Sequence, residues 1–295
     1  MIKFSVIIPF YKGNKYLQKM ISILEQNALS LREGNVTSQI EVIIVNDSPM
    51  EDVLLPNHSD NLNVNVIVHE KNSGIHQARI TGLNHCSGEY IKFIDQDDEI
   101  SAECLLKEYK AIGKADVVLS NAWSEKSDGS KVLHFKGKGQ YKNALIIGPY
   151  VKSHNQIISP GQCLIKKDSI PQEWLEYVMK KNGSDDLFLW LLMLAQNKEI
   201  TIIEEPLYTH KFTGSNLSAE EVKMAESSME TAEYLNEIEY IPKTLVKNFV
   251  RNRKMCIDSS GKNAFIRMWI WIKNMDIFLP RVFWKLRSYT GKFKY

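Results

Sequence analysis

Residues 1–120 alternate between short apolar runs and segments with helical spacing. The runs KFSVIIPF (3–10) and QIEVIIVN (39–46) are almost continuously apolar, which is typical of strands buried on both faces of a sheet. Helical segments of about 12 residues separate successive runs. Strands separated by such helices form βαβ units around a parallel sheet, so we expect an α/β fold.

The same patterns predict the remaining elements of the chain. We expect strands over 3–10, 39–46, 63–70, 89–95, 114–123 and 199–210. We expect helices over 14–27, 73–88, 101–113, 184–197 and 219–236, and a hairpin whose turn is Asp128-Gly129.

Cysteine usage and hydropathy favour a cytoplasmic protein. The four cysteines are scattered, with no C-x-x-C pair, which fits reduced thiols. The apolar N-terminus lacks the charged start and the small-residue cleavage site of a signal peptide. No stretch of the sequence reaches the roughly 18 apolar residues that a membrane-spanning helix needs.

Charge is distributed unevenly along the chain. Residues 243–295 carry 13 Lys or Arg and two acids, a net charge of +11, whereas the first 242 residues carry 24 bases and 33 acids, a net charge of −9. Aromatic residues lie among the bases of the C-terminal segment, and we expect Pro280 to separate two short helices there. Helices with rings on one side and bases on the other lie on anionic membrane surfaces. The alternative is that the rings pack inside the protein.

Acidic residues gather where two of the predicted strands end. Asp95, Asp97 and Asp98 follow the strand over 89–95, and Asp47 follows the strand over 39–46. Like charges this close need a cation between them. Carboxylates at strand ends suit Mg²⁺ or Mn²⁺, which bind one or two acids and then substrate phosphates. There is no G-x-G-x-x-G after the first strand and no P-loop motif in the sequence, so dinucleotide and P-loop sites lose their main support.

Four motifs together resemble the family 2 glycosyltransferases of the GT-A fold. They are SVIIPFY (5–11), EVIIVNDSP (41–49), NSGIHQARITGLNHCSGEYIKFIDQDDEI (72–100) and GSDDLFLWLLMLA (183–195), in the family's order and spacing. The resemblance covers roughly residues 3–218. It implies a Rossmann-like, nucleotide-binding mixed sheet flanked by helices, and an inverting, metal-dependent transfer of a sugar from a UDP-sugar.

The resemblance also assigns donor-binding roles. In that family a D-x-D-type motif binds Mn²⁺ or Mg²⁺ and the diphosphate, and it falls on Asp95, Gln96 and Asp97, with Asp98 adjoining. The arginine of the family's G-x-x-x-A-R-N-x-G pattern falls on Arg79. That residue is expected at the donor phosphates.

The same resemblance places the nucleobase. The acid after the second strand, which reads the base in that family, corresponds to Asp47. The end of the first strand lines the base pocket, and here that end is Pro9, Phe10 and Tyr11.

The family's E-D motif, whose aspartate is the general base, falls on Asp185 and Asp186. Asp186 is therefore the expected base and Asp185 a supporting acid. One departure concerns the segment YTHKFTG, which has no Arg-x-His. Lys211 could neutralise the diphosphate there, and a histidine ligand for the metal is not expected.

The resemblance implies a catalytic domain over 1–218, with a nucleotide-binding half at about 1–120 and an acceptor half at about 121–218. A helical extension follows over 219–295, basic and amphipathic from 243. The expected acceptor is a saccharide or lipid-linked saccharide of a bacterial envelope polymer, reached at the inner face of the cell membrane. A homodimer is left open. We do not expect nucleic-acid binding, because the body is acidic and no such module is recognisable.

Each assigned acid has an ordinary structural alternative. Asp47 lies in the sequence Asn-Asp-Ser-Pro, which is typical of turns. Asp95 to Asp98 could form a solvated turn. Asp185 and Asp186 could be acids that cap the N-terminus of a helix. Two other functions compete. A sugar-phosphate nucleotidyltransferase needs a Gly-rich basic loop after the first strand, and IIPFYKGNKY matches this poorly. A non-catalytic nucleotide-sugar-binding protein has no need for both Asp97 and Asp186.

Overall fold

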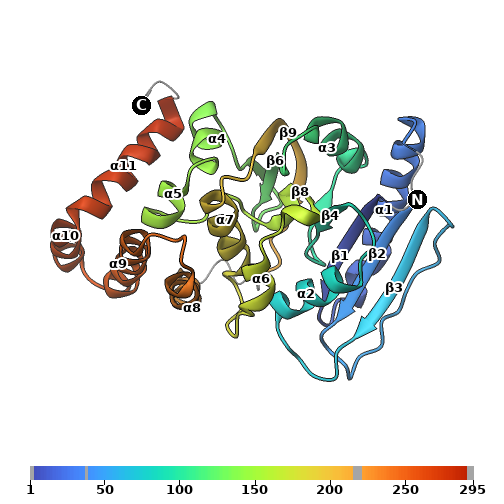
Figure 1. Ribbon diagram of the computed structural model, residues 1–295, viewed down its shortest axis with the longest axis horizontal. Coiled ribbons are helices and arrows are strands. Elements are labelled where there is room, and N and C mark those ends of the chain that lie inside the picture. Colours follow the sequence, from blue (N-terminus) through green and yellow to red (C-terminus); the bar gives the residue numbers. More distant parts are fainter. Residues whose placement is uncertain (1–2, 37–38, 215–220, 291–295) are drawn as a thin grey trace. The chain divides into compact units, whose positions relative to one another are not determined.

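The computed structural model describes residues 3–36, 39–214 and 221–290. It divides into two compact units, which we describe separately (Figure 1). The first unit comprises Met1–His134, Ile158–Lys180 and Lys198–Gly214, and the second comprises Phe135–Ile157, Lys181–Asn197 and Ser215–Tyr295. The domain boundary that the sequence predicts at 218/219 lies outside the described residues.

The first unit is built around one mixed sheet. Its strands are β1 (Phe4–Phe10), β2 (Ile40–Asn46), β3 (Leu62–Val68), β4 (Tyr90–Phe93), β5 (Glu99–Ile100), β6 (Val117–Glu125), β7 (Lys131–Leu133), β8 (Cys163–Lys166) and β9 (Ile200–His210). Their order among the described residues is β3-β2-β1-β4-β8-β6-β9-β5, with β7 paired to β6. The pairs β1–β2, β2–β3 and β1–β4 are parallel, while β8 is antiparallel to both β4 and β6. The α/β prediction is confirmed, with a mixed sheet.

Helices cover both faces of the sheet, as the continuously apolar strands predict. The helices of this unit are α1 (Asn14–Glu33), α2 (Ile75–His85), α3 (Cys104–Ile112) and α6 (Gln172–Glu176), with short 3₁₀ turns η1 (Pro160–Gln162) and η2 (Lys167–Ser169). Phe4, Val6 and Ile8 of β1 pack in one core with α1 and α3. Ile7 points to the other face, where a Cβ on Gly82 of α2 would lie 2.4 Å from its Cγ2.

The described part of the second unit is helical. Its elements are α4 (Lys138–Ala144), α5 (Ile147–Lys152), α7 (Asp185–Ala195), α8 (Glu221–Glu237), α9 (Lys243–Ser259), α10 (Ala264–Lys273) and α11 (Met275–Thr290). Helix α7 is its centre, because residues 187–193 are all buried. Helix α11 packs against α4 and α5, where Trp284 is buried and a Cβ on Gly148 would lie 2.9 Å from its ring.

The predicted helix break at Pro280 is wrong. Pro280 lies inside α11, and the break falls at Asn274, which ends α10. A proline removes the hydrogen bond to the carbonyl four residues earlier, here that of Asp276. Lys152 Nζ lies 3.4 Å from that carbonyl oxygen and donates to it instead. Trp284 and Arg287 of α11 are buried, so these two residues belong to the protein core.

None of the described helices combines the length and the apolar content that crossing a membrane requires.

Candidate active site

Asp98 is surrounded by hydrogen-bond donors from β9 and the residue that follows it. Its carboxylate accepts from the Tyr208 hydroxyl, lies 3.1 Å from His210 Nδ1, and accepts from the Lys211 backbone N–H at 2.7 Å. Burial opposes charge on His210, but the hydrogen bond to Asp98 and the charges of Asp98 and its neighbours outweigh burial and raise the pKa of His210. The protonated form of His210 is therefore favoured beside Asp98.

Tyr208 stays a phenol in this setting. Burial, followed by the negative charges of Asp98 and Asp95, raises its pKa well above the ordinary value for tyrosine. Tyr208 and His210 lie two residues apart on β9, so their side chains point to the same face of the sheet. Alternation along β9 is the signal by which the sequence could have found this pair.

Asp95 has a different cation. Arg79 Nη2 of α2 lies 2.5 Å from Asp95 Oδ1, and the Arg79 side chain is buried. Ser159 Oγ lies 3.2 Å from Asp95 Oδ2 and 2.9 Å from Tyr208 Oη. These contacts join the two acids through Ser159 and Tyr208. Arg79 thus contacts a carboxylate of the acid cluster directly, and its expected contact with the donor phosphates stays a prediction.

Asp97 remains as the third acid of the cluster. In the part of the chain that the structure describes, no ion pair and no hydrogen bond from another residue reaches its half-buried carboxylate. Burial, followed by the charges of Asp98 and Asp95, raises the pKa of Asp97 to about 6. Arg79 and His210 therefore contact two of the three acids directly, whereas Asp97 is affected by the charge of His210 without a direct contact to a described cation.

No group of three His, Cys, Asp or Glu side chains is arranged as a metal site among residues 3–36, 39–214 and 221–290. The prediction that Asp95, Asp97 and Asp98 are all metal ligands stays a prediction. The contacts just described give Asp95 and Asp98 other partners, so Asp97 is the carboxylate best placed to take a cation.

Gln96 connects the ends of β1 and β4. Its Oε1 accepts from the Tyr11 backbone N–H and its Nε2 donates to the Tyr11 carbonyl, both at 2.9 Å. A Cβ at position 13 would lie 2.1 Å from Gln96 Oε1, so a larger residue there would displace the Gln96 side chain from this position. Pro9 and Phe10 are buried in β1, and the Tyr11 side chain is exposed next to them. The predicted base-pocket residues are thus held beside the acid cluster.

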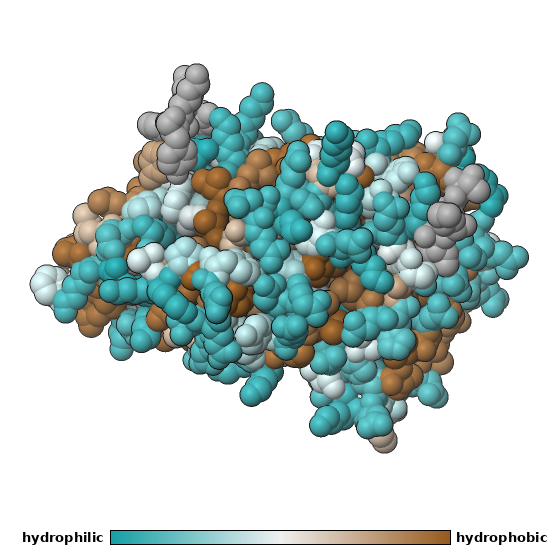
Figure 2. All heavy atoms as spheres, in the orientation of Figure 1, coloured by the Kyte–Doolittle hydropathy of each residue, from teal (hydrophilic) through white to brown (hydrophobic). Residues whose placement is uncertain are grey.

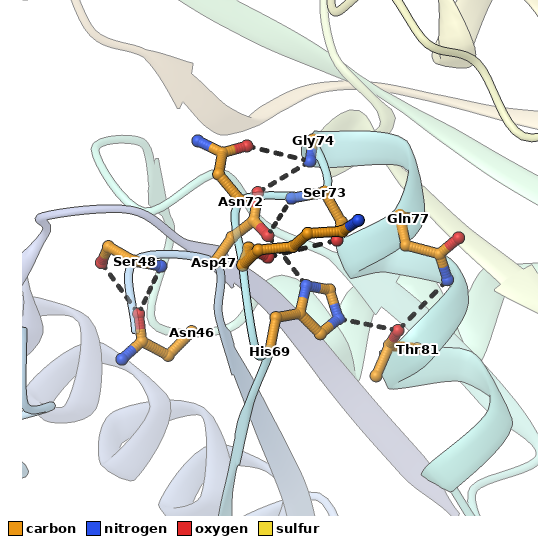
Figure 3. A network of polar contacts seen from close by, with 10 residues as sticks. Asn46, Asp47, Ser48, His69, Asn72, Ser73, Gly74, Gln77 and Thr81 are labelled. Atoms are coloured by element: carbon orange, nitrogen blue, oxygen red, sulfur yellow. Dashed lines mark hydrogen bonds and ion pairs between the residues drawn. The ribbon is translucent and has the colours of Figure 1, made fainter. Parts of the chain in front are cut away.

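Asp47 joins the end of β2 to the start of α2 (Figure 3). Its Oδ1 accepts from the Ser73 N–H at 2.7 Å, and its Oδ2 accepts from the Gly74 N–H at 2.8 Å. Gly74 has a φ of 89°, a conformation that glycine adopts at little cost. A carboxylate at the N-terminus of a helix is stabilised by the unpaired N–H groups there.

Figure 3 also shows a relay behind Asp47. Gln77 Nε2 lies 3.4 Å from Thr81 Oγ1, Thr81 Oγ1 lies 2.9 Å from His69 Nε2, and His69 Nδ1 lies 2.8 Å from Asp47 Oδ1. Since an ionised carboxylate only accepts hydrogen bonds, His69 Nδ1 carries a proton. The sequence carries no signal that links His69 to Asp47, and only the fold brings the two side chains together.

The turn after β2 is made by Asn46, the residue before Asp47. The backbone N–H and the hydroxyl of Ser48 both lie 2.8 Å from Asn46 Oδ1. Asp47 is therefore not the turn former that the structural alternative proposed. Three donors occupy its carboxylate, which offers about four acceptor positions, so its role as reader of the nucleobase stays a prediction.

Lys211 lies next to the acids that flank the cluster. Its Nζ is 2.6 Å from Glu125 Oε2 and 3.4 Å from Glu99 Oε1. These contacts raise the pKa of Lys211, with the hydrogen bond to Glu125 as the largest cause. Its predicted contact with the donor diphosphate stays a prediction.

Asp185 and Asp186 begin α7 in the second unit. Asp185 is buried, while Asp186 is half-buried. Asp186 Oδ1 accepts from the Leu187 N–H at 2.7 Å, and Oδ2 accepts from Asn155 Nδ2 at 2.8 Å. Both oxygens of this carboxylate are thus held. Asn155 carries no sequence signal that would have identified it.

Comparison with known protein families finds one that matches the chain. The family model "Glycosyl transferase family 2" matches residues 5–173. That match covers more than half of the chain. The chain belongs to glycosyl transferase family 2.

Relatives and solved structures agree with the family. "Glycosyltransferase GlyA" of Streptococcus pneumoniae is 31% identical over 230 residues, 73% of this chain and 31% of GlyA. "Poly(ribitol-phosphate) beta-N-acetylglucosaminyltransferase TarS" of Staphylococcus aureus is 28% identical over 231 residues, 74% of this chain and 37% of TarS. The chain spans about a third of the length of these two curated relatives.

Two solved structures share the fold. A crystal structure of S. aureus TarS 1–349 in complex with UDP-GlcNAc matches with a TM-score of 0.58 at 16% identity, covering 97% of this chain and 81% of that chain. The mannosyltransferase PcManGT from Pyrobaculum calidifontis, in complex with GDP-Man and Mn²⁺, matches with a TM-score of 0.53 at 10% identity, covering 99% and 88%. These likenesses confirm the GT-A fold of the family 2 chain.

Proposed function

We propose that the chain is a metal-dependent, inverting glycosyltransferase that moves a sugar from a UDP-sugar to a hydroxyl of a saccharide acceptor. The observation that carries this proposal is Asp97. It is a half-buried carboxylate after the end of β4 with a raised pKa, beside two acids that Arg79 and His210 contact. A cation that arrives with the substrate is the missing partner. Family membership supports the reaction type.

Mn²⁺ or Mg²⁺ fits this site by the chemistry of its donors. Such ions bind one or two carboxylates together with substrate phosphates, and Asp97 offers one carboxylate without a protein partner. Asp95, held by Arg79, and Asp98, held by His210, flank it. When bound, the metal supplies positive charge to the leaving diphosphate. PcManGT, a structure of the same fold, holds Mn²⁺ with its nucleotide sugar.

The residues of the first unit bind the donor in this proposal. Pro9, Phe10 and Tyr11 line the nucleobase pocket, and Asp47, fixed by its three donors, reads the base. UDP rather than another nucleotide is supported by TarS, which has the same fold and was solved with UDP-GlcNAc. Arg79, which contacts Asp95, and Lys211, which contacts Glu125 and Glu99, supply positive charge to the diphosphate in this proposal.

Asp186 acts as the general base in the second unit, with Asp185 supporting it. The acceptor hydroxyl oxygen forms a bond to the anomeric carbon while the bond from that carbon to the diphosphate oxygen breaks. The hydroxyl proton passes to Asp186, and the nucleoside diphosphate leaves with the bonding electrons. One base is sufficient for this displacement, because no covalent intermediate forms on the protein. The configuration at the anomeric carbon is therefore inverted.

The domain plan follows from these roles. We assign donor binding to about 1–120, acceptor binding to about 121–218, and a separate role to the helical extension over 219–295.

A panel of nucleotide sugars tests the proposed function. We expect the full chain with Mn²⁺ to release UDP from one or more UDP-sugars, and to release little GDP or CMP from the corresponding donors. Nucleotide release can be followed by chromatography, with the same mixture containing EDTA as the control. Equal turnover of all nucleotide classes, or turnover that EDTA does not change, would contradict the proposal.

The C-terminal helices suggest where the acceptor is met. No residue of α10 is buried. Its exposed stripe is formed by Phe265, Met268, Trp269 and Ile272, with Phe265 73% and Trp269 54% exposed. Helix α11 continues with exposed Met275, Leu279, Val282 and Leu286. Both sets recur every three or four residues, and Figure 2 shows brown apolar atoms at the surface of this end of the second unit.

We infer that this stripe docks on an anionic membrane surface, which would place the enzyme at the inner face of the membrane with a lipid-linked acceptor. Arg267 and Lys273 lie over the rings of Trp271 and Trp269, at 5.4 and 5.3 Å from the ring centroids. The segment 243–295 carries a net charge of +11. Bases near an anionic leaflet contribute about 1 kcal/mol each. The relative TarS, a poly(ribitol-phosphate) beta-N-acetylglucosaminyltransferase, supports an envelope polymer as acceptor.

The double substitution Phe265→Ser and Trp269→Ser tests the membrane inference. Both side chains are exposed, so the fold should be retained while apolar contact with lipid is lost. We expect the unmodified chain to co-sediment with phosphatidylglycerol vesicles at low salt and less at high salt, and the double variant to stay in the supernatant. Leu54→Ser, at another exposed apolar residue, is the matched control and should sediment normally. A stripe that instead mediates self-association would give a vesicle-independent dimer that the double variant abolishes, and this would overturn the inference.

A further inference from the structure

The carboxylate of Asp186 is held in one orientation by a residue distant in sequence. Asn155 follows α5, and its Nδ2 donates to Asp186 Oδ2 at 2.8 Å. The other end of the Asn155 amide is also fixed, because its Oδ1 accepts from the Ile157 N–H at 3.3 Å. That second bond turns the NH₂ group toward Asp186. Asp186 Oδ1 accepts from the Leu187 N–H at 2.7 Å.

Helix α9 fixes the segment that carries Asn155. Asn252 Nδ2 donates to the Ser153 carbonyl at 2.8 Å and to the Val151 carbonyl at 3.1 Å. Arg253 donates from Nη1 to the Ser153 carbonyl and from Nη2 to the Tyr150 carbonyl, both at 3.0 Å. These carbonyls lie at the C-terminal end of α5, where they have no partner within the helix. The turn between α5 and Asn155 is thus pinned from α9.

Arg253 is a buried cation whose Nη atoms bind the end of α5. Its side chain is buried, and burial lowers its pKa to about 10, so it remains charged at neutral pH. A cation at the C-terminal end of a helix meets the negative end of the helix dipole. A buried guanidinium is costly unless it is hydrogen-bonded, and here its Nη atoms bind backbone carbonyls on either side of the end of α5.

Helix α8 secures the other side of the same site. Ser184, which precedes α7, has its Oγ 3.0 Å from Ser228 Oγ of α8. The Lys181 N–H donates to Glu230 Oε2 of α8 at 2.9 Å. Gly183 has a φ of 113°, and a Cβ there would lie 2.7 Å from Met224 Sδ. The start of α7 is therefore seated on α8, while its carboxylate is oriented from the α5–α9 side.

We propose that Asn155 is a positioning residue for Asp186, and that Asn252 and Arg253 of α9 hold it in place. This inference rests on the proposed function, in which Asp186 is the general base. The C-terminal extension then has a second role besides the membrane surface. It sets the direction in which the base accepts the acceptor proton, and small errors in such a direction reduce rates by up to roughly 100-fold.

Two substitutions of Asn155 separate positioning from packing. Asn155→Ala removes the donor and the side chain. Asn155→Asp keeps the shape and the acceptor for the Ile157 N–H, but it places a like charge against Asp186. A positioning role predicts that kcat falls about 10-fold for Ala and about 100-fold for Asp, with the KM for the donor nearly unchanged. A packing role predicts the opposite order, with Ala the more damaging.

Controls keep the test interpretable. Asn248 is a half-buried residue of α9. Asn248→Asp makes the same change of charge there and should leave kcat unchanged. Arg253→Lys loses the planar fork that reaches two carbonyls, and its effect on kcat should be non-additive with that of Asn155→Ala if α9 acts through Asn155. Additive effects would overturn the part assigned to α9.

The outcome also separates this inference from the proposed function. Asn155 variants with normal kcat, alongside an inactive Asp186→Asn, would overturn the positioning role alone. An active Asp186→Asn would instead remove the general base on which both depend.

Discussion

Asp186→Asn is expected to lower turnover by about 10²- to 10⁴-fold, the usual contribution of a positioned base. The amide keeps the size of the side chain but cannot take the acceptor proton. Donor binding should survive, because the residues proposed to bind UDP lie in the first unit. The measurement is kcat for transfer at saturating donor, together with the affinity for UDP.

Asp185→Asn is the matched comparison for this prediction. Asp185 is buried in the first turn of α7, where an acid stabilises the helix by about 0.3–1 kcal/mol through the helix dipole. We expect Asp185→Asn to lower the melting temperature and to lower kcat much less than Asp186→Asn does. An inactive Asp185→Asn beside an active Asp186→Asn would show that the base is the preceding residue.

Asp97→Asn should abolish the metal dependence of UDP binding. It removes the carboxylate that no described residue neutralises, and the loss of affinity should exceed the roughly 10–100-fold that outer partners of a metal site contribute. Calorimetry with Mn²⁺ measures this. The exposed Asp60→Asn provides the same chemical change away from the cluster and should bind normally.

The same variant, which weakens UDP binding, should stabilise the fold when no metal is present. Burial and the neighbouring acids raise the pKa of Asp97 from 3.8 to about 6. The folded state therefore binds this proton more tightly than the unfolded state, and stability is lost as pH rises from about 4 to about 6. At pH 7 Asp97→Asn should increase the free energy of unfolding in EDTA. A decrease would indicate a structural role for the carboxylate.

The first half of the fold was predictable because its strands are buried on both faces. Continuous apolar runs marked β1 and β2, and the helices between them followed from helical spacing. The prediction of a helix break at Pro280 was wrong for a physical reason. A proline marks a lost hydrogen bond, but tertiary contacts such as that of Lys152 with the Asp276 carbonyl can satisfy the freed group.

Buried polar contacts were the least predictable part of the fold. Lys92 lies in β4, where alternation suggested only a strand, and its ammonium group is fully buried 2.7 Å from both carboxylate oxygens of Glu108. Such a pair joins residues on different elements. A sequence pattern reports the spacing within one element and cannot report a partner on another.

The same limit applies to the candidate site. The crowded acids after β4 indicated a cation site. The sequence also placed Asp47 at the end of a strand and Asp186 at the start of a helix. The sequence could not say which acid stays unpaired. That depends on Arg79, Ser159 and Tyr208, which reach the cluster only through the sheet order and through α2.

Calorimetric titration of UDP into the full chain tests the central claim most directly. The chain is titrated once with Mn²⁺ and once with EDTA, and the Asp97→Asn variant is titrated with Mn²⁺. The account predicts saturable binding for the unmodified chain with Mn²⁺, and binding that is lost or weakened by at least about 100-fold in the other two titrations. Equal UDP affinity in all three titrations, or no UDP binding by the folded chain with Mn²⁺, would contradict it.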